Sequence, residues 1–245
     1  MAFAPKLASV PTIAVRAPAG TLTVEIFEPA AAGARPLPGV VLLHDLLGLG
    51  DEIRRVARLI ADRGYLVAAP DLYSRRSRVR CVVRQVGEVM RARGETFDDI
   101  DATRRALADL PGCGGSIGVV GFCQGGRFAL LVAGTGDYDA AAPFYGTPLP
   151  PKIEQRLTGV CPVVASFGGK DPWNPRGTAG PQVRDILERL DVEHDVAVYP
   201  EAGHAFANRY PAQPVLRVAR FGYDDAAAAD AWDRVFAFFA AHLRR

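Results

Sequence analysis

The sequence lacks the features of a membrane or secreted protein. It contains no run of about 18 apolar residues, so no transmembrane helix is expected. Its first 20 residues lack a basic segment followed by an apolar one, so no secretory signal is recognisable. We therefore expect a cytoplasmic protein that does not bind membranes.

Metal, nucleotide and nucleic-acid sites also lack their usual signatures. The four cysteines form no Cys-x-x-Cys pair, and none of the four histidines has metal-ligand spacing. The glycine-rich segment 112–115 precedes a strand pattern, so it is not a dinucleotide-binding loop. A net charge of +2 is too small to indicate nucleic acid. We expect reduced thiols, no metal, no cofactor and no nucleic-acid partner.

What is present is an alternation of strand and helix patterns over 245 residues. The predicted strands are Leu22–Phe27, Val40–His44, Leu66–Ala69, Ile117–Val120, Ala140–Phe144, Val163–Phe167 and Val192–Tyr199. The predicted helices are one capped by Asp51 and stopped at Gly64, and those at Phe97–Leu110, Phe128–Ala133, Gln182–Leu190 and Asp225–Leu243. This alternation predicts a single α/β domain, residues 1–245, with a mostly parallel sheet and helices on both faces.

The most informative segment is 116–126, where a buried-looking strand runs into Gly-Phe-Cys-Gln-Gly and then an apolar helical run. This is the strand–turn–helix context of a nucleophile elbow, with Cys123 where serine usually stands. In so sharp a turn, a Cβ at Gly121 or Gly125 would collide with the neighbouring strand or helix. The elbow lifts the thiol off the sheet, and the N-terminus of the next helix favours a thiolate.

Two later residues have the positions expected of a base and its orienting acid. Asp171 follows the predicted strand that ends at Phe167, and His204 follows the one that ends at Tyr199. Residues just beyond parallel strands gather at the sheet edge where such folds place active sites. The chain order nucleophile, acid, histidine is typical of α/β-hydrolases.

Each of these residues also has a plainer interpretation. A cysteine in a glycine-rich turn is often a small buried hydrophobe, Asp171 can cap the turn before Pro172, and His204 can be a loop histidine. The order of three residues from three strand ends favours the catalytic hypothesis over these separate alternatives.

The loop after Val40–His44 is the predicted source of a second oxyanion donor. The backbone N–H groups of Leu46 and Gln124 are the candidates. Asp45 then lies at a strand end facing the nucleophile, where it can hold a proton or bond to the thiol, or it is simply the polar end of a core strand.

A basic run follows Tyr73. Its members are Arg75, Arg76, Arg78, Arg80, Arg84, Arg91 and Arg93. A solvated helix face is the favoured interpretation. The alternative is that one or two of these arginines bind a substrate carboxylate bidentately.

The motifs together resemble the dienelactone hydrolase family from about Val40 to the C-terminus. The resemblance rests on Gly121–Gly126, Asp171 after two glycines, Gly203–Ala207, Pro70–Tyr73 and the closing Trp232…Phe239. It implies an α/β-hydrolase fold, no cofactor, a monomer, and a Cys123–His204–Asp171 triad with Leu46 and Gln124 as oxyanion donors. The family's name activity opens a carboxylate-bearing dienelactone.

Three positions depart from the family pattern. The glutamate that contacts the thiol falls on Asp45, one methylene shorter. The substrate-binding arginine four residues after the histidine is Asn208 here, with Arg209 next to it. The other carboxylate-binding arginine has no clear counterpart, and Arg80 and Arg84 are the possible substitutes.

The sequence thus predicts a hydrolase of a small lactone or ester, with Tyr73, Tyr145, Trp173 and Phe206 as pocket walls. Two alternatives stay open at this point. One is an esterase or thioesterase of another substrate class with the same mechanism. The other is a non-hydrolytic protein whose reactive cysteine senses oxidants or binds a ligand.

Overall fold

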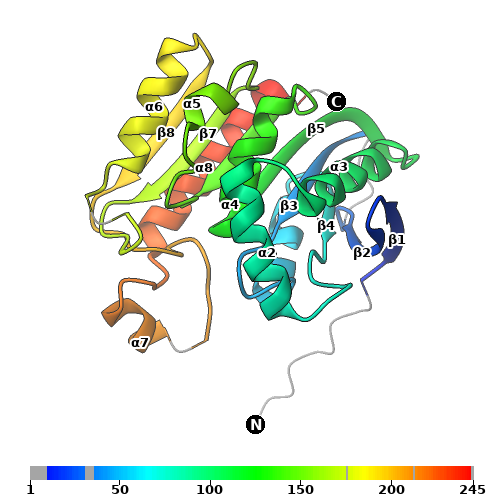
Figure 1. Ribbon diagram of the computed structural model, residues 1–245, viewed down its shortest axis with the longest axis horizontal. Coiled ribbons are helices and arrows are strands. Elements are labelled where there is room, and N and C mark those ends of the chain that lie inside the picture. The colour runs from blue at the N-terminus through cyan, green and yellow to red at the C-terminus, as the bar shows by residue number, and fades with distance from the viewer. Residues whose placement is uncertain (1–9, 31–35, 175, 212, 244–245) are drawn as a thin grey trace.

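One twisted sheet organises the protein, of which the computed structural model describes residues 10–30, 36–174, 176–211 and 213–243 (Figure 1). Its strands are β1 (Thr12–Ala17), β2 (Gly20–Phe27), β3 (Leu37–Leu43), β4 (Leu66–Pro70), β5 (Cys113–Phe122), β6 (Ala140–Phe144), β7 (Val163–Gly168) and β8 (His194–Tyr199). The strand order is β1-β2-β4-β3-β5-β6-β7-β8. β1 and β2 pair antiparallel at one edge, and every pair from β4 to β8 is parallel. The predicted mostly parallel α/β sheet is confirmed.

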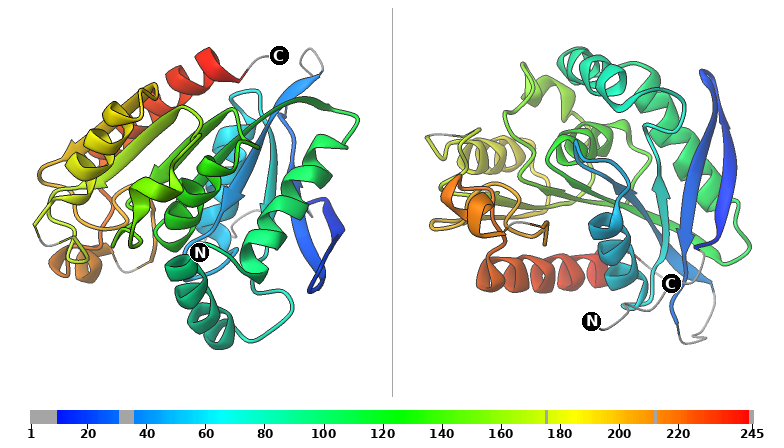
Figure 2. Two further views of the ribbon diagram at one scale, coloured as in Figure 1. Left: turned by 45° about the horizontal axis from the view of Figure 1, so that its top comes forward. Right: turned by 90° about the horizontal axis from the view of Figure 1, so that it is seen from below.

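Helices cover both faces of this sheet. The α-helices of the described chain are α1 (Asp51–Ala61), α2 (Arg78–Arg91), α3 (Glu95–Ala108), α4 (Gln124–Val132), α5 (Ile153–Arg156), α6 (Ala179–Arg189), α7 (Gln213–Val218) and α8 (Asp225–His242). In Figure 2, α1 and α8 lie on one side of the sheet and α2, α3 and α4 on the other. None of the helices described is long and apolar enough to cross a bilayer.

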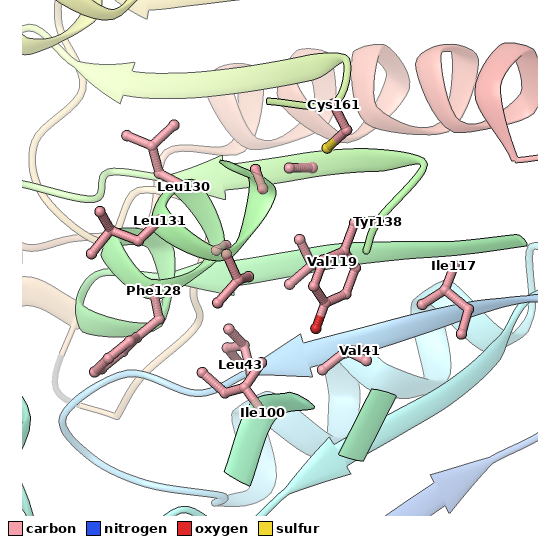
Figure 3. Close-up of a cluster of buried hydrophobic side chains, with 14 of the residues drawn as sticks. Val41, Leu43, Ile100, Ile117, Val119, Phe128, Leu130, Leu131, Tyr138 and Cys161 are labelled. Carbon is pink, nitrogen blue, oxygen red and sulfur yellow. The ribbon is translucent and has the colours of Figure 1, made fainter. Parts of the chain in front are cut away.

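The central strands carry apolar side chains on both faces, which produces two cores. One core packs α3, α4 and α6 against the sheet, and the other packs α1 and α8 against the opposite face. Figure 3 shows part of the first, where Val41 and Val119 from the strands face Phe128 from α4 and Ile100 from α3. Strands buried on both faces are therefore continuous apolar runs, as the sequence predicted.

All seven predicted strands occur, with ends displaced by up to a few residues. The N-cap at Asp51 was wrong by one position. Gly50 is the cap residue, because its carbonyl accepts the first helical bond from the Arg54 amide. Asp51 instead begins the helix and contributes negative charge to its first turn.

β1, α5 and α7 have no counterpart among the predicted elements. β1 is a short edge strand whose side chains are mostly exposed, so it lacks a strong apolar run. α2 carries most of the basic run, for which a solvated helix face was the favoured interpretation, although its outward-facing valines Val79 and Val83 left the bounds of that helix undefined in the sequence. α7 lies within the chain that projects from the body below α8 (Figure 1).

Phe128 provides a test of this core. Its side chain is fully buried and meets Phe97 edge-on, with 5.2 Å between ring centroids. Phe128→Ala is expected to lower the free energy of unfolding by about 3–5 kcal/mol, because it leaves a cavity in a closely packed layer. Urea denaturation measures the change. Val83→Ala, at a 70% exposed position, is the matched control and should change it by less than about 0.5 kcal/mol. Equal effects would contradict the described core.

Candidate active site

Cys123 sits at the turn between β5 and α4, in a backbone conformation that side chains rarely adopt. Its φ is 53°, in the left-handed region. The turn is held by the Cys123 amide, which donates to the Phe144 carbonyl at 3.0 Å. A Cβ at Gly121 would lie 2.2 Å from the Gly125 carbonyl oxygen, and one at Gly125 would lie 2.4 Å from that of Leu43. The glycines are therefore required by backbone contact, as the sequence predicted.

The thiol of Cys123 is held in an environment that disfavours its ionisation. The residue is 7% exposed. Burial, followed by the nearby negative charge of Asp45, raises the pKa of Cys123 from 9.0 to about 12, although the Gln124 backbone N–H opposes the shift. The resting protein therefore carries a neutral thiol at pH 7, and the helix N-terminus alone does not produce a thiolate.

Asp171 and His204 form a buried hydrogen-bonded pair at the carboxyl ends of β7 and β8. His204 Nδ1 lies 2.8 Å from Asp171 Oδ2. The same carboxylate accepts from the Thr147 hydroxyl at 2.8 Å and from the Trp173 amide at 2.8 Å. Acceptance by Asp171 places the proton on Nδ1 of a neutral His204, so Nε2 presents its lone pair.

The backbone of His204 is fixed by a returning segment. Its amide donates to the Arg220 carbonyl at 2.7 Å. That approach needs Gly203, because a Cβ there would lie 2.1 Å from the Arg220 oxygen. Trp173 and Phe221 pack against the imidazole, with ring centroids 4.5 and 5.4 Å away. His204 Nε2 is buried and has no hydrogen-bond partner among the described residues, so it is available to a reacting group.

Cys123 and His204 open into the same hollow, which has a volume of about 390 Å³. Apolar side chains dominate its wall, and its lining residues are Asp45, Leu46, Leu47, Cys123, Trp173, His204, Ala205, Tyr210, Pro211, Leu216 and Phe221. A larger hollow of about 760 Å³ between α5 and α6 includes no cysteine or histidine among its described lining residues. The smaller hollow is thus the candidate site, since it joins the cysteine of the elbow to a histidine held by a buried carboxylate.

Two backbone N–H groups were predicted to bind the oxygen of a substrate carbonyl. The Gln124 N–H is directed at the Cys123 sulfur. The Leu46 N–H donates no hydrogen bond to any described residue, and Leu46 lines the hollow. Leu46 and Cys123 line the same hollow, so the N–H groups of Leu46 and Gln124 stay the predicted oxyanion donors.

The carboxylate of Asp45 is engaged away from the thiol. It accepts from the Leu47 amide at 2.8 Å and from the Tyr210 hydroxyl, and within the described chain it has no hydrogen bond to Cys123. Burial raises the pKa of Asp45 despite these donors. His44 beside it is structural, since Nδ1 donates to the Asp45 carbonyl and Nε2 accepts from the Leu72 amide.

The four residues expected to form pocket walls take different positions. Trp173 lines the hollow, 39% exposed. Tyr145 and Phe206 are fully buried behind His204, where Tyr145 donates to the side-chain oxygen of Asn208. Tyr73 is half-buried, with its hydroxyl 3.5 Å from the Asp45 carbonyl oxygen. Four of the predicted substrate-binding residues therefore lie outside the hollow and support the site from there: Tyr73, Tyr145, Phe206 and Asn208.

The three candidate arginines lie outside the hollow as well. Arg84 pairs with Glu88 at 3.4 Å and with Glu95 at 3.1 Å. Arg209 stacks on the Tyr223 ring, and Arg80 is exposed on α2. Conversely, sequence reasoning missed Thr147, which no motif marks, and the pocket residues of segment 210–221. The aromatic residues Tyr210 and Phe221, which follow the histidine on either side of α7, were the available signal.

Comparison with known proteins places this arrangement in a family. The model of the dienelactone hydrolase family matches residues 22–243. The carboxymethylenebutenolidase of Pseudomonas putida is 30% identical over 217 residues, which cover 84% of this chain and 86% of that protein.

Solved structures share the fold. A dienelactone hydrolase-like promiscuous phosphotriesterase from metagenomic libraries has a TM-score of 0.81 at 23% identity, covering 96% of this chain and 99% of that one. An acylaminoacyl peptidase of Pyrococcus horikoshii has a TM-score of 0.73 at 14% identity, covering 96% of this chain and 42% of that one. These likenesses concern architecture alone, and they confirm the predicted α/β-hydrolase fold.

The match of the family model spans nearly the whole chain, from β2 to the end of α8, and includes the elbow and both loops of the acid–histidine pair. The chain therefore belongs to the dienelactone hydrolase family and is a hydrolase of carboxylic esters or lactones.

Proposed function

We propose that the protein hydrolyses a small lactone or ester through a Cys123–His204–Asp171 triad. The observation that carries this proposal is the buried Asp171–His204 pair: His204 lines the same hollow as the elbow thiol, and its Nε2 has no hydrogen-bond partner among the described residues. Similarity to the carboxymethylenebutenolidase of Pseudomonas putida supports a lactone, including one that bears a carboxylate. A cytoplasmic location and a monomeric state stay predictions from the sequence.

The reaction begins with transfer of the thiol proton from Cys123 Sγ to His204 Nε2 as sulfur attacks the carbonyl carbon. The carbonyl oxygen takes the negative charge and is bound by the Leu46 and Gln124 N–H groups. When the tetrahedral intermediate collapses, the C–O bond breaks and His204 gives its proton to the leaving oxygen. A thioester on Cys123 remains.

Hydrolysis of the thioester reverses these roles. His204 takes a proton from water, the resulting hydroxide attacks the thioester carbonyl, and the C–S bond breaks. The sulfur recovers the proton from His204, and the carboxylic acid leaves. Asp171 holds the imidazole in one tautomer throughout and stabilises its protonated form.

The environment of the thiol disfavours the oxidant-sensor alternative. Oxidant-sensing cysteines are exposed and have a low pKa, whereas Cys123 is buried with a raised pKa. A neutral thiol next to an oriented base is instead suited to ionise as it attacks a bound carbonyl. An esterase or thioesterase of another substrate class keeps the same mechanism, and substrate profiling separates it from the lactone hydrolase.

Removal of the nucleophile tests the triad. Cys123→Ala and Asp171→Asn are each expected to lower kcat for an activated ester about a thousandfold or more, because attack and base orientation are lost. The measurement is release of 4-nitrophenol from 4-nitrophenyl acetate. Cys113→Ala, which removes a half-buried thiol at the start of β5, is the control and should keep full activity. Near-normal hydrolysis by Cys123→Ala would refute the mechanism.

Alkylation of the thiol tests the effect of Asp45. At pH 8 the raised pKa keeps Cys123 protonated, so iodoacetamide should modify it more slowly than an ordinary thiol of pKa 9.0. Asp45→Asn removes a negative charge that raises this pKa, so the rate at pH 8 should increase by roughly threefold to tenfold. Mass spectrometry of the Cys123 peptide gives the rate. Asp51→Asn, at an exposed carboxylate, should leave the rate unchanged, and a slower Asp45→Asn would contradict the described electrostatics.

A further inference from the structure

A second hollow meets the first one at the nucleophile. It has a volume of about 360 Å³ and is lined by Leu46, Val82, Val86, Cys123, Gln124, Arg127, Thr147, Pro148 and Trp173. Leu46, Cys123 and Trp173 line both hollows. The thiol therefore lies between two chambers, one containing His204 and the other containing Arg127.

Arg127 is a buried cation for which the described part of the chain supplies no balancing anion. The residue is 7% exposed, and the structure shows no ion pair for it among the described residues. Its one side-chain hydrogen bond within that part of the chain goes from Nη1 to Gln124 Oε1 at 3.0 Å. Burying an unpaired charge is costly, and a guanidinium cannot escape that cost by losing its proton. A neutral Cys123 thiol does not supply the missing negative charge.

The donors left without partners lie beside the hollow. Arg127 Nε and Gln124 Nε2 are both buried and have no hydrogen-bond partner in the described chain. Arg127 is four residues after Cys123 and three after Gln124 on α4, so it shares their side of the helix. Helical side chains lean toward the N-terminus, which directs the guanidinium back toward the elbow. This chamber thus presents N–H donors of net positive charge.

The chemistry of the triad assigns a part of the substrate to each chamber. His204 must protonate the leaving oxygen, so that oxygen belongs on the His204 side. The acyl group stays on Cys123 and extends into the other chamber, past Gln124 toward Arg127. Val82 and Val86 provide an apolar wall for a short carbon chain there.

We propose that Arg127 is a specificity-determining residue that binds an anionic group, of the carboxylate class, at the far end of the substrate's acyl part. The inference rests on the proposed function, since it assumes an acyl group on Cys123. Gln124 orients the guanidinium through its amide oxygen and adds a donor through its amide nitrogen. The acid released would then be a dicarboxylate.

Matched ester pairs test the inference in the intact protein. The anionic probes are mono-4-nitrophenyl succinate and glutarate, and the neutral probes of equal chain length are 4-nitrophenyl butyrate and pentanoate. The wild type should prefer at least one anionic ester over its neutral partner. Arg127→Gln should lower kcat/KM for that ester about thirtyfold, mainly through KM, and change the neutral ester less than about threefold. Arg127→Lys should lower kcat/KM for the anionic ester less than Arg127→Gln does, because lysine keeps the positive charge but not the two parallel N–H donors of the guanidinium.

Controls separate this inference from the proposed function. Arg93→Gln removes an exposed arginine beyond the end of α2 and should leave both esters unaffected. Equal losses on both esters in Arg127→Gln, or no anionic preference in the wild type, would overturn the role of Arg127 while the triad stands. Hydrolysis that survives Cys123→Ala would overturn the proposed function instead. If Arg127→Gln does not fold, the comparison of Arg127→Lys with wild type on the same pairs decides.

Discussion

The close backbone approach at the end of β5 is the constraint on which the site depends. At Gly121 and Gly125 the neighbouring backbone leaves no space for a side chain, because an added Cβ would lie 2.2 and 2.4 Å from carbonyl oxygens. This contact fixes the φ of Cys123, the start of α4 and the direction of the Gln124 N–H together. Arg127 follows one helical turn later, so its position is also determined by the elbow.

Groups on opposite sides of the Cys123 thiol have opposite effects on its pKa. On one side Asp45, held by Leu47 and Tyr210, disfavours the thiolate. On the other side the Gln124 N–H favours it, and the charge of Arg127 acts in the same direction. The balance leaves a protonated thiol in the resting protein, which limits its reaction with oxidants. In the proposed mechanism, ionisation of the thiol depends on His204 and a bound substrate, which would couple the reactivity of Cys123 to substrate binding.

Much of this arrangement could be predicted from the sequence because it is local in the chain. Continuous apolar runs mark strands buried on both faces, and the glycine pattern marks the elbow. Asp171 and His204 could be identified because parallel strands end at one sheet edge, whatever the loops between them do.

Other parts could not be predicted because they depend on long-range packing. Tyr145 and Phe206 are aromatic residues of the kind that often line pockets, yet they fill the space behind His204. Tyr210 reaches Asp45 across 165 positions of sequence, and no local pattern encodes that contact. The density of charge in the arginine-rich segment suggested a site for a substrate carboxylate, but Arg84 is paired with the neighbouring Glu88 and Glu95. Arg127, a single arginine on an apolar helix, has no such density of charge around it in the sequence. Its distinctive feature is burial with no acidic partner among the described residues.

The two chambers would have different consequences for the leaving oxygen of an ester and for that of a lactone. An ester releases its alcohol from the His204 side, so the first product can leave before water attacks the thioester. A lactone keeps its leaving oxygen attached to the acyl chain, and that oxygen can return to the thioester and close the ring again. An acyl part held at its far end by Arg127 would keep the chain extended through the second chamber. Its freed oxygen would then be held away from the carbonyl while His204 activates water, which favours hydrolysis over ring closure.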